Sequence, residues 1–263
     1  MIRAYPRHAI NLDLSAYLKY VGLARYGELV EGDDIFAFEK AFAAFTGATS
    51  CVAVSSARAG FYLTMKSMGI GPGDEVIMPA YTFASMPAAV AATGARPVFV
   101  DMEAGSYNID AALAEKSVTE KTRAIVAAHL FGAAANIERL AEITRERGIM
   151  LIEDCAHAAG AVKNGQRVGS FGDAAVFSFG IGKNMPCFGG GMIAFSNSEL
   201  AGKVRRLVNA SPPVDNMTAH KKVLSSIPAF LGTRRVIFGW TLYVAARVLS
   251  SLGSDAMDRA VRE

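Results

Sequence analysis

The residue with the clearest chemical potential is Lys183, which lies in a loop between two apolar stretches, 174–179 and 192–195. An amine that is held away from water loses its proton more easily than a solvated amine, and the neutral form can attack a carbonyl carbon. A lysine flanked by buried strands and by the glycines at 189–191 has no evident structural use. We therefore predict that Lys183 is catalytic and forms a Schiff base with an aldehyde cofactor, pyridoxal 5'-phosphate.

The apolar stretch 149–154 ends in two carboxylates, Glu153 and Asp154, and His157 follows three residues later. A carboxylate beside a pyridine nitrogen keeps that nitrogen protonated, and the protonated ring draws electrons from a substrate carbon. This chemistry gives Asp154 a catalytic and cofactor-binding role, whereas the alternative is a carboxylate that caps the following helix. His157 either donates to the ring hydroxyl of the cofactor or is an ordinary hydrogen-bonded histidine.

Other residues could hold the phosphate and the flat ring of such a cofactor. Ser56, Ala57 and Arg58 join a strand-like stretch to a helical pattern, and the backbone amides at a helix start bind phosphate. Ser178 could add a hydroxyl group, and Phe83 could stack over the ring. Each feature also has a simpler explanation. Ser178 could bond locally to the backbone, Phe83 could belong to the core, and the three glycines could only shape a turn.

Short apolar stretches alternate with helical patterns from residue 50 onward, which predicts the elements that position these residues. Strands are expected at 51–54, 75–79, 97–101, 124–130, 149–154, 174–179 and 192–195, and helices at 35–45, 59–69, 84–93, 110–116, 136–147 and 198–208. Apolar strands that alternate with helices predict an α/β fold in three layers, α/β/α, with a mostly parallel sheet covered on both faces. Ligands of such sheets bind beyond the carboxyl ends of the strands, where 55–56, 80–82, 129–132 and 153–157 are polar or glycine-containing.

Composition restricts the class of protein. The 263 residues are 52% hydrophobic and 19% charged with a net charge of +3, which favours a sizeable core and indicates neither disorder nor nucleic-acid binding. Three widely spaced cysteines predict no metal site and no disulfide framework, and they suit a reducing compartment. The N-terminal sequence lacks the apolar core of a signal peptide, so we expect a cytoplasmic location.

The two ends of the chain differ from the middle. We interpret residues 1–32 as an N-terminal arm that could reach across a partner and 33–210 as the cofactor-binding large domain. Two prolines in 211–216 indicate a boundary, after which 211–263 forms a helical C-terminal segment. The apolar stretch 236–252 has 17 residues and contains Arg247. Because a spanning helix needs about 20 apolar residues, a packing, interfacial or subunit-contact helix is favoured over membrane contact.

Over roughly residues 30–208 the chain resembles the DegT/DnrJ/EryC1/StrS aminotransferases, pyridoxal-phosphate enzymes of fold type I that aminate nucleotide-linked keto-sugars. The matching segments appear in the family's order and are FEKAFAAFTG, SSARAGFYL, GPGDEVIMPAYTFAS, GARPVFVD, AHLFG, LIEDCAHAAGA and GDAAVFSFGIGKN with its glycine tail. The resemblance implies that glutamate is the amino donor and that a nucleotide-linked sugar is the acceptor. It also implies a role in polysaccharide or glycoside biosynthesis and a homodimer whose sites lie at the subunit interface.

The resemblance also implies roles for individual residues. Lys183 is the Schiff-base lysine, which the family's dehydratase branch replaces by histidine, and Asp154 is the partner of the pyridine nitrogen. His157 lies near the ring hydroxyl, and Phe83 is the stacking aromatic. The phosphate-binding positions are Ala57, Arg58 and Ser178.

Two departures from the family pattern bear on activity. Ser56-Ala57-Arg58 replaces the frequent Ser-Gly-Thr turn, which removes a threonine hydroxyl. No Gly-Tyr-Asn-Tyr-Arg-like segment follows the lysine strand, so the family's small C-terminal domain is expected to be incomplete or divergent. Three alternatives therefore stay open: a non-catalytic descendant that binds or regulates, a pyridoxal enzyme of another reaction type such as a lyase, and a plain nucleotide-binding α/β domain. The last leaves Lys183 without a role.

Overall fold

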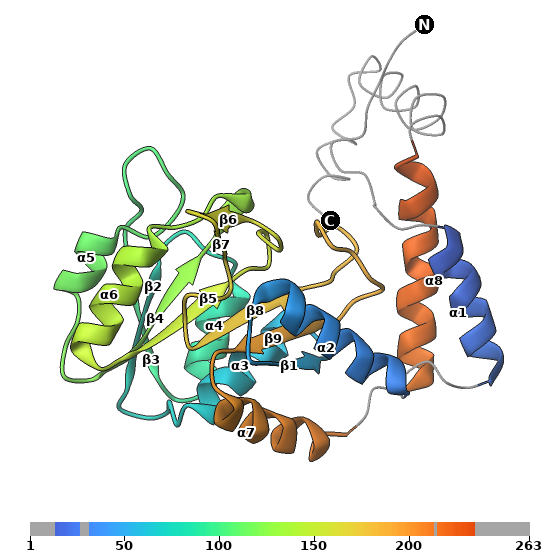
Figure 1. Cartoon of the computed structure of the whole chain (residues 1–263), viewed down its shortest axis with the longest axis horizontal. Coiled ribbons are helices and arrows are strands. Elements are labelled where there is room, and N and C mark those ends of the chain that lie inside the picture. The colour runs from blue at the N-terminus through green and yellow to red at the C-terminus, as the bar shows by residue number, and fades with distance from the viewer. Residues whose placement is uncertain (1–13, 27–31, 213–214, 235–263) are drawn as a thin grey trace, which may run out of the picture.

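The computed structural model describes residues 14–26, 32–212 and 215–234, which form a mixed sheet between two layers of helices (Figure 1). The sheet has the strand order β1-β9-β8-β5-β4-β2-β3. Its strands are β1 (Ser50–Val54), β2 (Glu75–Pro79), β3 (Arg96–Val100), β4 (Thr122–Ala128), β5 (Met150–Asp154), β8 (Ala174–Ser178) and β9 (Gly191–Phe195). The helices are α1 (Leu14–Tyr26), α2 (Asp33–Thr46), α3 (Ala57–Ser67), α4 (Ser85–Ala92), α5 (Ala111–Lys116), α6 (Ile137–Arg147), α7 (Ser198–Asn209) and α8 (Asn216–Gly232).

The sheet is parallel except for one strand. β9 runs antiparallel to both of its neighbours, β1 and β8, and the other pairings are parallel. The carboxyl ends of the parallel strands therefore meet at one edge of the sheet, together with the amino end of β9. The predicted α/β class with a mostly parallel sheet is confirmed.

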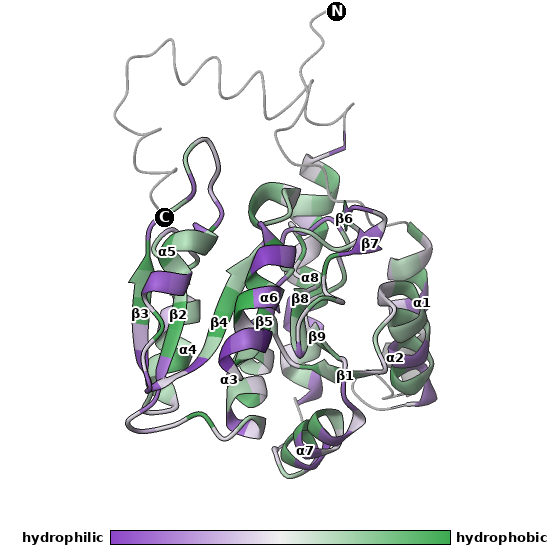
Figure 2. Cartoon of the chain, turned by 60° about the vertical axis from the view of Figure 1, so that its left-hand side comes forward, coloured by the Kyte–Doolittle hydropathy of each residue, from purple (hydrophilic) through white to green (hydrophobic). Residues whose placement is uncertain are grey.

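The two faces of the sheet are buried under different helices because successive residues of a strand point to opposite faces. On β4, Val126 belongs to the apolar cluster formed with α3, α4 and α7, whereas Ile125 and Ala127 belong to the cluster formed with α5 and α6. Helix α2 covers the same face as α5 and α6 at the other end of the sheet, where Phe42 packs on Phe177. Burial on both faces explains why the inner strands are mainly apolar, as their mostly green colour in Figure 2 shows.

The structure corrects one strand boundary and adds one small element. The predicted strand 124–130 ends at Ala128, and Leu130–Gly132 forms a short 3-10 turn, η1. Asn108 closes this turn, because its side chain accepts from Leu130 N and donates to the Ala133 carbonyl. The hairpin β6 (Val162–Lys163) and β7 (Gln166–Arg167) has two residues in each strand and left no detectable pattern in the sequence.

Helices α1 and α8 lie side by side at one end of the molecule (Figure 1). Tyr17 of α1 packs against Phe230 of α8, and its hydroxyl bonds to Ser226 at 3.0 Å. The described part of the predicted N-terminal arm thus forms a helix over 14–26, which contacts the C-terminal part of the same chain. The stretch 236–252 lies outside the described residues, and among those described there is no helix with the length and apolarity to cross a membrane.

Candidate functional site

Lys183 lies in the loop between β8 and β9, at the edge where the parallel strands end. The backbone holds this loop, because Lys183 N bonds to the Gly180 carbonyl at 2.9 Å and Asn184 Nδ2 bonds to the Ala159 carbonyl at 2.7 Å. The Lys183 side chain is half-buried. Burial lowers the pKa of its ammonium group, and the negative charge of Asp154 opposes part of this shift. The structure therefore provides a partly desolvated amine near a carboxylate.

Asp154 is the last residue of β5 and is buried, with 9% of its surface exposed. Its Oδ1 accepts a hydrogen bond from Ala156 N at 3.0 Å, and the described part of the chain supplies no donor to Oδ2. Burial raises the pKa of the carboxyl group, while the Ala156 N–H and the charges of His157 and Lys183 act in the opposite direction. Oδ2 of Asp154 is therefore free to accept a hydrogen bond from a ligand.

His157 lies in the turn that follows β5, and its ring is largely exposed. Desolvation lowers the pKa of the ring, the nearby positive charge of Lys183 lowers it further, and Asp154 opposes both. His157, Asp154 and Lys183 all lie at the edge where the parallel strands end, and their charges influence one another.

The segments predicted to bind phosphate converge on the start of β9. Ser56 is the N-cap of α3, and its hydroxyl accepts from Ala59 N at 3.1 Å. Ser56 also forms a parallel bridge with Gly190, and Ser178 at the end of β8 pairs with Gly191. A Cβ built on Gly180 would lie 3.8 Å from Lys183 Cγ and 3.9 Å from Ser178 Oγ, so these two side chains border the same glycine. The start of α3, Ser178 and the lysine loop therefore form one continuous surface.

Ala57, Arg58 and Phe83 lie at the same edge with fewer contacts. Ala57 and Arg58 form the first turn of α3, where backbone N–H groups lack intrahelical acceptors, and the Arg58 side chain is exposed. Phe83 follows β2 and is 69% exposed, so it is not part of the core. An exposed ring beside a strand end is free to cover a flat ligand.

Gly191 is required where these segments meet. A Cβ at this position would lie 2.7 Å from Ala57 N and 2.8 Å from the Phe177 carbonyl oxygen, and both of these atoms are backbone. Gly191→Ala is therefore expected to lower the free energy of unfolding by about 1–3 kcal/mol, measured by urea denaturation. Gly182→Ala is the control, since nothing lies within 4 Å of its added Cβ. Equal stability of the two variants would contradict the close packing of α3 on β9.

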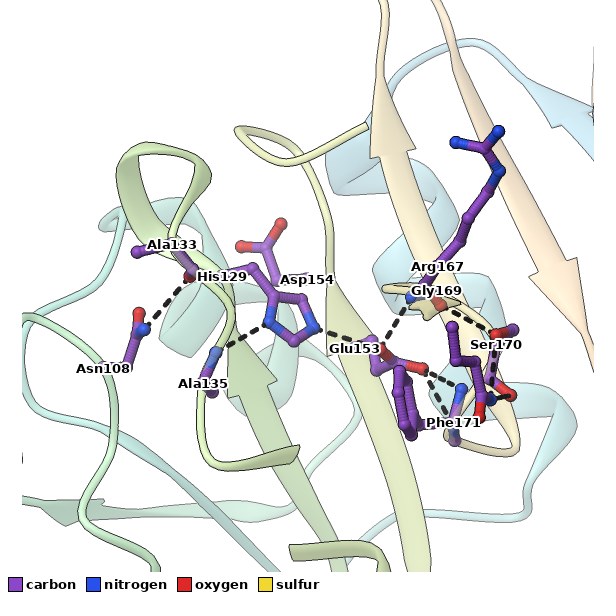
Figure 3. A network of polar contacts seen from close by, with 12 residues as sticks. Asn108, His129, Ala133, Ala135, Glu153, Asp154, Arg167, Gly169, Ser170 and Phe171 are labelled. Atoms are coloured by element: carbon purple, nitrogen blue, oxygen red, sulfur yellow. Dashed lines mark hydrogen bonds and ion pairs between the residues drawn. The ribbon is translucent and has the colours of Figure 1, made fainter. Parts of the chain in front are cut away.

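The sequence did not assign a role to Glu153, whose side chain is fully buried and lies in a hydrogen-bond network (Figure 3). Its Oε1 accepts from Phe171 N and Gly172 N, both at 2.8 Å, and its Oε2 accepts from Gly169 N at 2.7 Å and His129 Nε2 at 3.0 Å. His129 Nδ1 accepts from Ala135 N at 3.1 Å, so the imidazole proton lies on Nε2 and the ring is neutral. Glu153 is thus an ionised carboxylate that fixes the loop before β8.

Glu153 and His129 were both expected at the ligand-binding edge, and the structure corrects this expectation. Each side chain is 0% exposed and bonded within the protein, because alternate residues of a strand point to opposite faces and only Asp154 of the carboxylate pair faces the site. A charged residue inside an otherwise apolar strand was the available signal for such a network.

His129, Glu153 and Cys155 lie close enough together to suggest a metal site, since their potential ligand atoms fall within 4.8 Å of one another. The hydrogen bonds argue against it. His129 has no free nitrogen lone pair, and four donors occupy the Glu153 carboxylate. Burial also raises the pKa of the Cys155 thiol well above its ordinary value, which keeps the thiol protonated. The cluster therefore acts as a hydrogen-bond network.

Glu153→Gln is expected to lower the free energy of unfolding by about 2 kcal/mol, because the amide group would turn an N–H₂ toward backbone donors. Urea denaturation measures the loss. Glu142→Gln, which removes only an exposed ion pair with Arg139, is the matched control and should change little. A Glu153→Gln protein as stable as the wild type would contradict an ionised Glu153.

A cavity of about 1110 Å³ lies away from this chemistry. It borders the free edge of β1 between α1, α2, α7 and α8, and its lining includes Ser55, Gly189 and Gly190 but neither Lys183 nor Asp154. We place the candidate active site at the strand ends, where the titratable groups gather, and not in this cavity.

Comparison with known proteins identifies the class. The sequence profile of the DegT/DnrJ/EryC1/StrS aminotransferase family matches residues 17–234, and the chain belongs to this family. It is 41% identical over 181 residues to the spore coat polysaccharide biosynthesis protein SpsC of Bacillus subtilis (strain 168), covering 69% of this chain and 46% of SpsC. It is 40% identical over 184 residues to the dTDP-3-amino-3,4,6-trideoxy-alpha-D-glucose transaminase of Streptomyces venezuelae, covering 70% of this chain and 48% of that enzyme.

A solved structure shows the same fold. Spr1654 of Streptococcus pneumoniae, in its PLP-form, superposes with a TM-score of 0.72 at 28% identity, over 77% of this chain and 57% of that chain. The family assignment and the fold thus agree with the resemblance found in the sequence motifs. The chain spans about half the length of the curated relatives it matches.

Proposed function

We propose that this chain is the cofactor-binding part of a pyridoxal-phosphate-dependent aminotransferase. In this proposal it moves an amino group from an amino acid, glutamate, to the keto group of a nucleotide-linked sugar for polysaccharide or glycoside biosynthesis. The observation that supports it most directly is the grouping of Lys183, Asp154 and His157 at the carboxyl edge of the family's sheet. The names of the relatives, a transaminase and a polysaccharide biosynthesis protein, support the substrate class.

The residues fit the four functional groups of pyridoxal 5'-phosphate. Lys183 offers a partly desolvated amine for the aldehyde, and Asp154 offers an oxygen without a donor for the pyridine nitrogen. His157 offers a ring N–H for the hydroxyl group, and the exposed Phe83 offers a ring face. The phosphate would lie at the start of α3, against Ser56, Ala57, Arg58 and Ser178.

When bound, this cofactor supplies an electron sink for the electron pair released at the substrate carbon. The chain's residues supply the binding and the proton transfers. With the cofactor bound, Lys183 Nζ would accept the proton from the substrate carbon, because burial favours its neutral form. Asp154 Oδ2 would accept a hydrogen bond from the protonated ring nitrogen, and His157 would orient the ring through its hydroxyl group.

The arrangement of the chain forms part of the same proposal. Residues 33–210 would be the cofactor-binding domain, 1–32 an arm, and 211–263 a helical segment that replaces or precedes the family's small domain. A second copy of the chain would complete the site, as the family resemblance implies. A cytoplasmic location agrees with three free cysteines, of which Cys187 is exposed.

Two measurements on the purified chain test this function. The first adds pyridoxal 5'-phosphate, records the visible absorption band, reduces with borohydride and identifies the modified lysine by peptide mass. The second supplies glutamate and a dTDP-linked keto-sugar and follows the formation of the amino-sugar. We expect modification at Lys183 and glutamate-dependent product. Reduced protein with an unmodified Lys183 would refute the site. Cofactor binding without turnover would favour the non-catalytic alternative. A product that contains no nitrogen from the amino donor would favour a lyase.

A further inference from the structure

A row of exposed aromatic rings connects two loops that carry predicted site residues. Tyr81 lies two residues before Phe83, and its ring centroid is 5.5 Å from that of Tyr107. Tyr107 meets Phe131 edge to face at 5.3 Å. Phe131 in turn stacks on the ring of His157, with centroids 5.8 Å apart and an interplanar angle of 27°. The row therefore ends on one of the groups that we assign to the cofactor.

Phe131 reaches this position through an unfavourable backbone conformation. Its φ and ψ are 55° and 24°, in the left-handed region that a residue with a bulky side chain rarely adopts. Its ring is also 64% exposed, so burial does not account for its place. Strain of this kind persists where the surrounding structure enforces it and is concentrated at functional sites.

The surrounding hydrogen bonds enforce this conformation from two sides. Asn108, itself buried, bonds to Leu130 N at 3.0 Å and to the Ala133 carbonyl at 3.1 Å, on either side of Phe131. His129 is bonded to Ala135 and Glu153, and its backbone N donates to the Asp154 carbonyl at 3.0 Å. The η1 turn is thus attached to the end of β5, beside the turn that carries His157.

His157 has few other constraints. Within the described parts of the chain, no hydrogen bond reaches its ring, and the side chain is exposed in a turn. The stacked Phe131 ring is a contact that limits its orientation. A histidine that must present one nitrogen to a fixed partner needs such a support, as ligating and catalytic histidines usually receive from a hydrogen bond.

We propose that Phe131 is a positioning residue, which holds the His157 imidazole in the orientation that the cofactor's ring hydroxyl requires. This inference rests on the proposed function, because it assigns a purpose to the contact between His157 and the cofactor. Phe131 itself would act through His157 and would not touch the reacting atoms.

The test compares three variants of the whole chain with the wild type. Phe131→Leu removes the ring, Phe131→Tyr keeps it, and Phe131→Gly removes it while relieving the left-handed strain, so that a loss of fold cannot explain the result. Phe99→Leu is the control, since Phe99 is an exposed phenylalanine on β3, 52% accessible. The first readout is the ring C–H proton resonances of His157 in the cofactor-free protein, assigned by their loss in His157→Gln. The second readout is the dissociation constant of pyridoxal 5'-phosphate from its absorption spectrum.

We expect Phe131→Leu and Phe131→Gly to shift the His157 resonances downfield, because the shielding by the stacked ring is lost, and to weaken cofactor binding about twofold to tenfold. Phe131→Tyr and Phe99→Leu should resemble the wild type in both readouts. Unchanged His157 resonances in the two variants without the ring would overturn the proposal, as would shifted resonances with unchanged cofactor affinity. A wild-type chain that binds no pyridoxal phosphate would instead overturn the proposed function, and the cofactor-free spectra would still report whether Phe131 stacks on His157.

Discussion

Replacing Lys183 by alanine is expected to abolish covalent attachment of pyridoxal phosphate and to reduce amino transfer by about 10⁴-fold or more. The substitution removes a nucleophile and a proton carrier at once, and a positioned acid–base group alone contributes about 10²–10⁴ in rate. Folding should be retained, because Lys183 is a half-buried loop residue and the loop is held by the Lys183 backbone and by Asn184. The measurement combines steady-state turnover with peptide mass after borohydride reduction.

Lys183→Arg distinguishes the amine chemistry from a need for positive charge. Arginine keeps the charge near Asp154 but stays protonated at every working pH, so it can neither attack the aldehyde nor accept a proton. Lys121→Ala is the matched control, since Lys121 is exposed next to β4 at the opposite edge of the sheet, where the parallel strands begin. Activity that survives in Lys183→Arg, or that falls equally in Lys121→Ala, would show that Lys183 is not the reacting amine.

The sequence predicted the fold well because local patterns determine it. The strands and helices between residues 33 and 209 agree with the expected elements to within a few residues, apart from the end of β4 and the small hairpin β6–β7. Apolar strands of five to seven residues, most of them followed by a helix, leave few arrangements other than a covered, mainly parallel sheet. The edge at which strands end also predicted where Asp154, His157, Ser178 and Lys183 would gather.

The residues that support the site could not be predicted from the sequence, because their positions depend on contacts with residues far away in the chain. Glu153 and Asp154 are adjacent in the chain, but only the completed sheet shows that one points into the core and the other into the site. The left-handed Phe131 depends on Asn108, which lies 22 residues before Leu130. No local pattern predicts such a contact, since the preference of phenylalanine is for other backbone conformations.

Asp154→Asn is expected to separate catalysis from stability. Asparagine keeps the shape of the side chain but carries no charge to hold the ring nitrogen protonated, and amino transfer should fall by about 10²–10³-fold, as when a preorganised electrostatic group is removed. Attachment of the cofactor to Lys183 should persist, because the amine is unchanged. The variant should therefore show the reduced, cofactor-labelled Lys183 peptide together with slow turnover, a combination that Lys183→Ala cannot give.

The stability of the cofactor-free variant provides the second part of this test. Burial raises the folded-state pKa of Asp154 above its unfolded value, so its favourable contribution is complete below the unfolded pKa and is lost as pH rises through the folded pKa. Because asparagine cannot ionise, Asp154→Asn should be at least as stable in urea at neutral pH, with a flatter dependence on pH. Asp101→Asn is the control, since Asp101 makes the same type of contact, from Met102 N to Oδ1 at 2.8 Å, but is exposed. A loss of stability at neutral pH in Asp154→Asn, or full activity of that variant, would show that Asp154 supports the fold and not the cofactor.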